Sequence, residues 1–136
     1  MSTRIEIKYE GQLQCCAVHT PSGDKLLTDA PPDNAGRGLH FSPTDLVAAA
    51  SGACMLTVMG IAAQRHGLSI DGARASVDKA MSTSGRRFIE GLAIHLVLPA
   101  TLKPEDRELL ERTARSCPVT ASLSADTEID VRFTYE

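Results

Sequence analysis

The chain is organised around residues 41–67, which read FSPTDLVAAASGACMLTVMGIAAQRHG. Ser42 is a good helix N-cap, Pro43 suits the first helical position, and Asp45 stands where a capping-box acid belongs. From residue 46 to residue 63 almost every side chain is small or apolar, so the helix has no wide polar face. We therefore predict a helix that starts at Ser42, stops at Gly67 and lies buried in the core.

The remaining sequence predicts strands and two further helices. Alternating polar and apolar residues predict a hairpin in the first eighteen residues and a short strand near residues 25–28. Residues 29–40 contain two prolines and two glycines and predict an irregular loop. Strands are expected over 68–81, 88–98 and 129–135, with a helix from Pro104 and a short one from Pro118. This order predicts a single α+β domain over residues 1–136, with antiparallel sheets around the long helix.

The composition argues against several classes of protein. Apolar residues make up 43% of the chain and the net charge is -3, with acidic and basic residues interleaved. No basic face is available for nucleic acid, and we expect neither a signal sequence nor a membrane-spanning segment. The expected location is cytoplasmic. Because one modest sheet cannot cover a helix that is apolar all round, we expect a homodimer.

The chemistry of the chain depends on four cysteines. Cys54 lies inside the apolar helix, where burial favours a protonated, inert thiol. Cys117 precedes a proline at a helix start, where unpaired N–H groups favour the thiolate. Cys15 and Cys16 point to opposite faces of a strand and are expected to pack there. No close cysteine or histidine pair suggests a metal site, no Gly-rich loop suggests a phosphate site, and we expect no cofactor.

Two motifs together resemble one known family. The segment SPTDLVAAASGAC at residues 42–54 and the segment SCPV at residues 116–119 are similar to the OsmC/Ohr proteins, the osmotically inducible and organic hydroperoxide resistance proteins. The resemblance extends along essentially the whole chain. It implies an OsmC-like fold and an intertwined homodimer, with the two central helices back to back and active sites at the subunit interface.

The resemblance also implies a reaction. Cys54 would attack an organic hydroperoxide, and the sulfenic acid formed would be resolved by Cys117 as a disulfide. A dithiol or a lipoylated protein would then reduce the disulfide. Apolar side chains of Phe41, Met55 and Met59 are expected to line the substrate pocket.

The sequence departs from the hydroperoxide-resistance branch at two positions. That branch activates its cysteine with an arginine on the first hairpin, held by a glutamate directly after the helix-start proline. Here Thr44 occupies the glutamate position and the hairpin has no arginine, so we expect Arg37 as the substitute cation and Asp45 as the acid that holds it. The departure indicates a divergent OsmC-like member.

The same departure leaves two other functions open. One is a binding or interaction protein that holds a small hydrophobic ligand on this fold and has little peroxidase activity. The other is a cysteine hydrolase or transferase, for which a histidine would have to lie beside the nucleophile.

Overall fold

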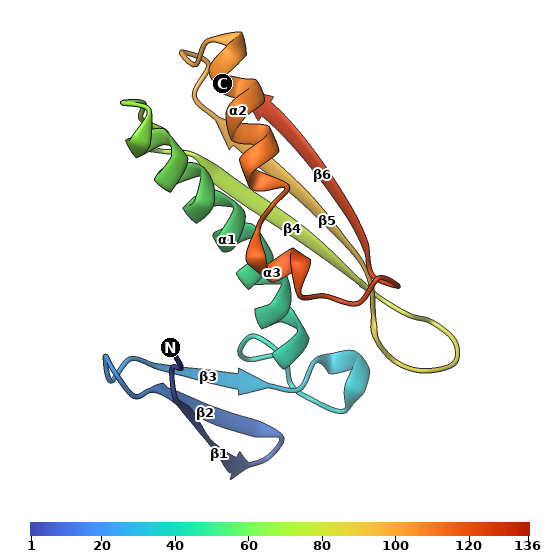
Figure 1. Cartoon of the computed structure of the whole chain (residues 1–136). Helices are drawn as coiled ribbons and strands as arrows, with labels where there is room; N and C mark the ends of the chain where they lie inside the picture. The colour runs from blue at the N-terminus through green and yellow to red at the C-terminus, as the bar shows by residue number, and fades with distance from the viewer. The chain divides into compact units, whose positions relative to one another are not determined.

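The computed structural model describes residues Met1–Glu136. The chain forms two compact units, Met1–Leu46 and Val47–Glu136, and each unit contains one three-stranded sheet (Figure 1). The predicted α+β class is confirmed. The two units are described in turn.

The first unit is an antiparallel sheet in the order β1-β2-β3, built from β1 (Ile5–Gly11), β2 (Gln14–His19) and β3 (Lys25–Asp29). Gln12 and Leu13 connect β1 to β2, and both have positive φ, at 54° and 64°. Two such residues give a hairpin turn whose twist matches that of the strands. The predicted hairpin and the short strand after it are therefore confirmed.

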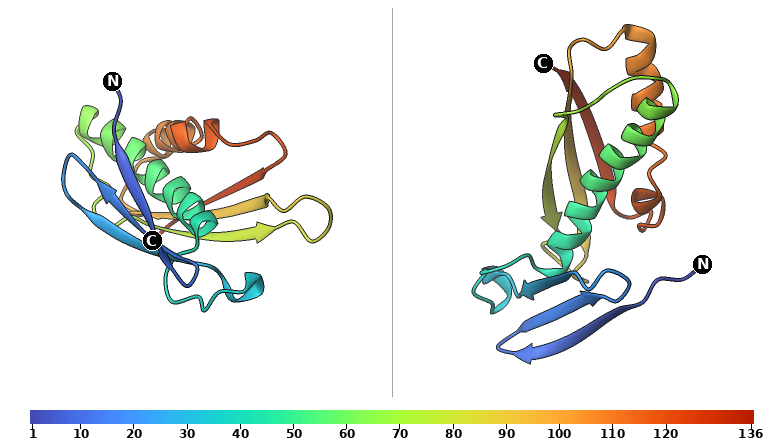
Figure 2. Two further views of the ribbon diagram at one scale, coloured as in Figure 1. Left: turned by 90° about the horizontal axis from the view of Figure 1, so that it is seen from below. Right: turned by 90° about the vertical axis from the view of Figure 1, so that its left-hand side faces the viewer.

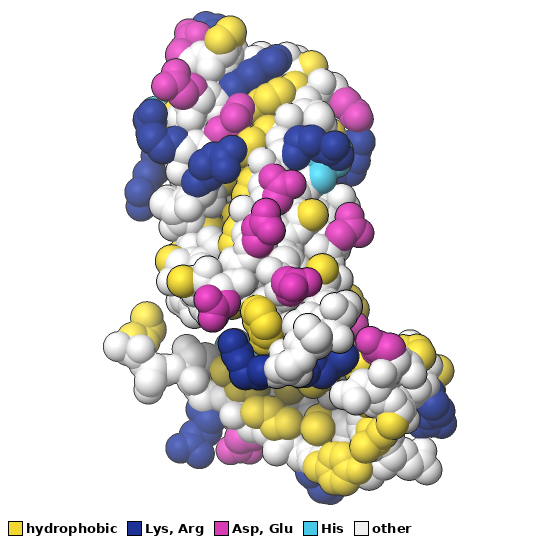
Figure 3. Space-filling view, turned by 90° about the vertical axis from the view of Figure 1, so that its right-hand side faces the viewer, with side chains coloured by type: hydrophobic (Ala, Val, Ile, Leu, Met, Phe, Trp, Pro, Cys, Tyr) yellow, Lys and Arg dark blue, Asp and Glu magenta, His cyan; other side chains and the backbone are white.

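The first unit has no apolar core of its own. All fully buried apolar residues of the chain lie beyond Val47, whereas the buried residues of this unit are polar: Thr28, Asp29 and Ser42. Hydrophobic side chains gather on its surface (Figure 3). The exposed large apolar side chains are Ile5, Ile7, Tyr9, Leu13, Leu26, Leu27, Leu39 and Phe41.

Helix α1 (Pro43–Arg65) begins where the sequence predicts. The Ser42 N–H donates to Asp45 Oδ2 at 2.9 Å, and the Asp45 N–H donates to Ser42 Oγ at 3.1 Å, which is a complete capping box. At the other end Gly67 has φ +68°, and the Leu68 N–H donates back to the Ala63 carbonyl at 2.8 Å. This is the glycine-terminated C-cap that the sequence predicts.

In the single chain α1 is covered on one side only, and the burial of its other side by a second copy stays a prediction. One side packs against the sheet of the second unit, where a Cβ at Gly52 would lie 3.0 Å from Val77 Cγ2. The opposite side is exposed, and its residues are Ala49, Ala50, Ala53, Thr57, Ile61 and Gln64. By length and composition alone α1 is apolar enough to cross a membrane, contrary to the expectation that no stretch reaches that length, although soluble core helices meet the same criterion.

The sheet of the second unit contains β4 (Arg74–Met81), β5 (Ile89–Leu98) and β6 (Glu128–Tyr135), in the order β4-β5-β6. Strand β4 starts later than predicted because Gly72, with φ +86°, forms a turn before it. Strand β6 runs parallel to β5, so the prediction of antiparallel pairing is wrong for this ladder. Parallel neighbours need a crossover, and α2 (Pro104–Ala114) and α3 (Pro118–Ala121) form it.

The core of the second unit lies between this sheet and the helices α1 and α2, which cover the same face of the sheet (Figures 1 and 2). The inward residues of β5 alternate as predicted and are at most 2% exposed. These residues are Leu92, Ile94, Leu96 and Leu98. Met55 and Met59 of α1 and Leu110 of α2 pack against them with no more than 1% exposure.

Candidate active site

The structure brings the two predicted reactive cysteines together in the second unit. Cys54 lies in the middle of α1, and Cys117 is the N-cap residue of α3. The two thiols lie close enough to shift each other's pKa, and neither takes part in a disulfide. Cys117 is completely buried, whereas Cys54 is only partly buried at the edge of the core. A small molecule that reaches the pair therefore meets Cys54 first.

The backbone around Cys117 is fixed from both sides. The Cys117 N–H donates to the Ala114 carbonyl at 3.2 Å, which closes the last turn after α2. The Cys117 carbonyl accepts the Ala121 N–H at 3.1 Å, which forms the turn of α3. Pro118 at the first position of α3 has no N–H to leave unpaired. The short connection between two helices thus places this sulfur against α1.

The two thiols have opposite pKa shifts. Burial raises the pKa of Cys54, and its hydrogen bond with Cys117 raises it further, while the Val119 N–H opposes the shift. Burial also acts to raise the pKa of Cys117, but hydrogen bonds from the Cys54 thiol and from the Thr120 and Val119 N–H groups outweigh it and lower the pKa. The lowered pKa of Cys117 agrees in direction with its place before Pro118 at a helix start.

A cavity of about 310 Å³ lies between α1, α3 and β6. It is lined by Met55, Arg115, Thr120, Ala121, Ile129 and Val131. Its walls combine apolar side chains with those of Thr120 and Arg115. The Arg115 guanidinium lies over the Phe133 ring, 5.3 Å from the centroid. Of the two methionines expected in a substrate pocket, Met55 lines this cavity, while Met59 lies in the core.

The other predicted site residues belong to the first unit. Phe41 is 56% exposed. The Thr44 hydroxyl lies 3.2 Å from Ser42 Oγ. Asp45 takes part in the capping box with Ser42. Arg37 donates to Gln12 Oε1 at 3.1 Å. The roles of Arg37, Thr44 and Asp45 toward Cys54 stay predictions.

Sequence reasoning did not single out Asp29. It is completely buried at the end of β3, and its Oδ2 accepts the Leu39 N–H at 3.0 Å. This hydrogen bond lowers the pKa of Asp29, and the charge of Arg37 contributes to the lowering. The Asp29 N–H also donates to the Phe41 carbonyl at 3.1 Å. Asp29 therefore anchors both ends of the loop that carries Arg37.

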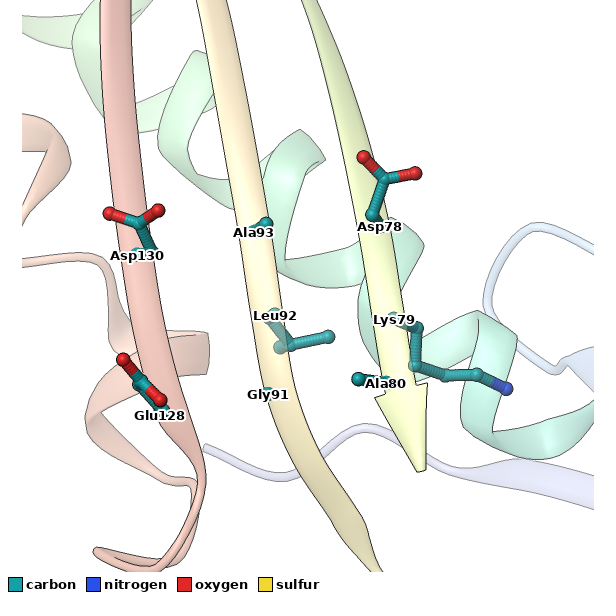
Figure 4. Close-up of a pocket in the computed structure, with 8 residues that line it drawn as sticks. All are labelled: Asp78, Lys79, Ala80, Gly91, Leu92, Ala93, Glu128 and Asp130. Carbon is teal, nitrogen blue, oxygen red and sulfur yellow. The ribbon is translucent and has the colours of Figure 1, made fainter. Parts of the chain in front are cut away.

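A second cavity, of about 320 Å³, lies on the outer face of the β4-β5-β6 sheet (Figure 4). Its floor is formed by Gly91 and Ala93 of β5, whose small side chains leave the space open. Asp78 and Asp130 flank Ala93 on the neighbouring strands, and Glu128 pairs with Gly91. No three His, Cys, Asp or Glu side chains anywhere in the chain are grouped so as to hold a metal ion.

Comparison with known proteins identifies the family of the chain. The sequence model of the OsmC-like proteins matches residues 36–132. No curated protein matches the sequence. A crystal structure from Psychrobacter arcticus 273-4, of a protein assigned to osmotic stress induction and the detoxification response, is 34% identical with a TM-score of 0.92. The match covers 98% of this chain and 97% of that one.

More distant structures share the fold. An organic hydroperoxide resistance protein OsmC from Legionella pneumophila is 18% identical, with a TM-score of 0.78 over 98% of this chain and 97% of that one. The organic hydroperoxide resistance protein OhrB of Bacillus subtilis is 16% identical, with a TM-score of 0.69 over 98% of each chain. The family match and the 34% identity along nearly the whole length agree, and the chain belongs to the OsmC-like protein family.

Proposed function

We propose that this protein reduces organic hydroperoxides to alcohols, with Cys54 as the attacking thiol and Cys117 as the resolving thiol. The observation that carries the proposal is the proximity of one partly exposed thiol and one buried thiol, contributed by distant parts of the sequence. The names of the fold relatives from Legionella pneumophila and Bacillus subtilis, which are organic hydroperoxide resistance proteins, agree with this chemistry.

The contact between the sulfurs suits a two-step reaction. The Cys54 thiolate attacks the outer peroxide oxygen, an alcohol leaves, and Cys54 becomes a sulfenic acid. Cys117 then displaces the hydroxyl group from Cys54 and forms a disulfide. In the disulfide the two sulfurs would lie about 2.05 Å apart. A dithiol or a lipoylated protein would restore both thiols, and free thiols fit the reducing conditions of the cytoplasm.

The proposal includes a homodimer. The exposed side of α1 is made mostly of small and apolar residues, and a second copy packed against it would bury that surface. In the same proposal Arg37 supplies the cation near Cys54, next to Thr44 and Asp45. Sedimentation at several protein concentrations tests the dimer, and a monomer at every concentration would contradict it.

The first experiment treats fully reduced protein with one equivalent of cumene hydroperoxide, counts the thiols lost and maps the products by peptide mass. We expect the rapid loss of two thiols and a disulfide between Cys54 and Cys117. Cys54→Ser should abolish the reaction. Cys15→Ser, which changes a half-buried thiol of β2, is the matched control and should leave it unchanged.

The alternative is a binding protein for a small hydrophobic ligand, and the cavity beside Met55, whose walls include Ile129 and Val131, is the observation that favours it. If both thiols persist under conditions in which a free thiol in solution reacts, the peroxidase proposal fails. Saturable binding of an apolar fluorescent probe by the same protein, weakened by Met55→Glu, would then support the binding function.

A further inference from the structure

Arg115 is a cation without a negative partner at the cavity between α1, α3 and β6. It follows the end of α2 and lines the cavity, and no carboxylate forms an ion pair with it. Arg112, nearby on the same helix, does have such a partner, Glu108 at 3.9 Å. None of the residues that line the cavity is acidic. The charge of Arg115 is therefore uncompensated where a ligand would lie.

The cavity adjoins the segments that carry the two candidate thiols. Thr120 and Ala121 line it, and both donate to the Cys117 carbonyl, through the Thr120 hydroxyl at 3.2 Å and the Ala121 N–H at 3.1 Å. Met55, which follows Cys54 in α1, forms another wall. A molecule held in the cavity would therefore lie beside the residues that carry both sulfurs while it contacts the cation.

The position of Arg115 over an aromatic ring suits it to bind a carboxylate. Its guanidinium lies 5.3 Å from the centroid of the Phe133 ring. A guanidinium stacked in this way keeps N–H groups at the edge of its plane, where two of them can donate in parallel to the oxygens of a carboxylate. The ring also restrains the side chain, so less conformational entropy is lost when an anion binds. Ile129 and Val131 provide apolar contacts for the hydrocarbon part of such a ligand.

We propose that Arg115 determines substrate preference by binding a carboxylate of the substrate, so that the preferred hydroperoxides are compact organic acids with an apolar body. The inference rests on the proposed function and names its substrate class. The cavity volume of about 310 Å³ lies at the lower end of the range of small-molecule sites, about 300–1,000 Å³, which favours a compact acid over a long-chain one. The carboxylate takes no part in the reaction. The O–O bond breaks as in the proposed mechanism, and the product is the corresponding hydroxy acid.

The test compares two hydroperoxides that differ only in one charged group: cumene hydroperoxide and its derivative with a carboxylate in the para position. The value of kcat/KM is measured for each, with dithiothreitol as the reductant. We expect the wild type to prefer the carboxylate by about tenfold, mainly through a lower KM, because the contact with Arg115 is present before and during the reaction. Added salt should reduce this preference. Equal values of kcat/KM in the wild type would overturn the inference.

Substitutions of Arg115 test whether this residue causes the preference. Arg115→Gln should bring the ratio of the two kcat/KM values close to one, and Arg115→Lys should retain part of the preference. Arg112→Gln is the matched control, because Arg112 pairs with Glu108 and does not line the cavity, and it should keep the wild-type ratio. If Arg115→Gln lowers both values by the same factor, Arg115 does not select the carboxylate and the inference fails.

A binding measurement separates this inference from the proposed function. Calorimetry compares para-isopropylbenzoate, which contains no peroxide, with the neutral para-isopropylbenzamide. We expect the wild type to bind the carboxylate about tenfold more tightly, and Arg115→Gln to remove the difference. Equal affinities, or no binding of either compound at millimolar concentration, would overturn the inference. If the carboxylate binds through Arg115 but Cys54 reacts with neither hydroperoxide, the anion site is supported and the proposed function fails.

Discussion

The two units of this chain are stabilised by different interactions. In Val47–Glu136, helices and strands enclose a core in which Leu96, Leu110 and Met59 are completely buried. In Met1–Leu46, apolar side chains lie on the surface and the buried residues are polar, with Asp29 joined to the loop after β3. The second unit thus gains stability from apolar burial, and the first from backbone pairing and hydrogen bonds.

This contrast bears on where chemistry can take place. A rigid core holds two side chains from distant parts of the sequence at a fixed separation, which the reaction of two thiols needs. A sheet with exposed apolar residues and an anchored loop is better suited to packing against another surface. Four substitutions test the contrast.

The largest effect is expected from Leu96→Ala in the second unit. Leu96 is 0% exposed, so we expect the free energy of unfolding to fall by about 2–5 kcal/mol, measured by urea denaturation. Ile7→Ala in the first unit is the matched comparison, since Ile7 is 63% exposed, and its loss should be less than half as large. Equal losses would show that the sheet of the first unit is covered in the assembled protein, and the contrast would fail.

Ser42→Ala tests the residue that starts α1. The substitution removes the hydroxyl that accepts the Asp45 N–H, and we expect a loss of about 1 kcal/mol in thermal or urea unfolding. Ser42→Thr retains the hydroxyl and should lose much less. A loss in Ser42→Ala no greater than in Ser42→Thr would show that the capping box contributes little to the start of the helix.

Tyr135→Phe tests a polar contact at the edge of the second unit. It removes the hydrogen bond from the Tyr135 hydroxyl to Glu111 but retains the ring, over which Arg107 lies 4.1 Å from the centroid. We expect a loss of about 0.5–1.5 kcal/mol in urea denaturation. Phe133→Leu removes the ring beneath Arg115. Its effect on the free energy of unfolding shows how much the stacked cation contributes, separately from the Tyr135 hydrogen bond. If Tyr135→Phe does not lower the free energy of unfolding, the stacked rings and not the hydrogen bond stabilise this edge.

The effect of Asp29→Asn is expected to be seen mainly as a change in pH dependence. The folded state lowers the pKa of Asp29 below its ordinary value of 3.8, so the ionised carboxylate stabilises the fold at neutral pH. That stabilisation is lost as the pH falls through the lowered pKa. The urea midpoints of wild type and Asp29→Asn should therefore differ at pH 7, begin to converge below about pH 4, and meet only below the lowered pKa. A difference that stays constant with pH would assign Asp29 a role that does not depend on its charge.

The features that the sequence predicts correctly are those with local causes. The capping box at Ser42, the glycine stop at Gly67 and the alternation along β5 each depend on residues close together in the chain. The direction of β6 could not be predicted, because it depends on which edge of the sheet the chain reaches after α3. That one copy leaves part of α1 uncovered follows from its all-round apolar composition, but composition does not show which residues lie on the exposed side.

The candidate site, like the fold, could be predicted only in part from the sequence. Local reasoning indicates an acidic thiol at Cys117, and the structure agrees with it. The roles assigned to Cys54 and Cys117 come from the family resemblance. The Val119 and Thr120 donors are not visible in the sequence, because a backbone N–H acquires its direction only from the turn in which it lies.

The parallel ladder between β5 and β6 has a consequence for synthesis of the protein. Cys117 lies on the connection between these strands, and the core around it includes Ile129, Val131 and Phe133 of the last strand. A growing chain cannot complete this core until β6 has left the ribosome, so the two thiols stay independent and open to chemical modification until then. Protection of Cys117 from an alkylating reagent would therefore mark the moment at which the newly made chain finishes folding.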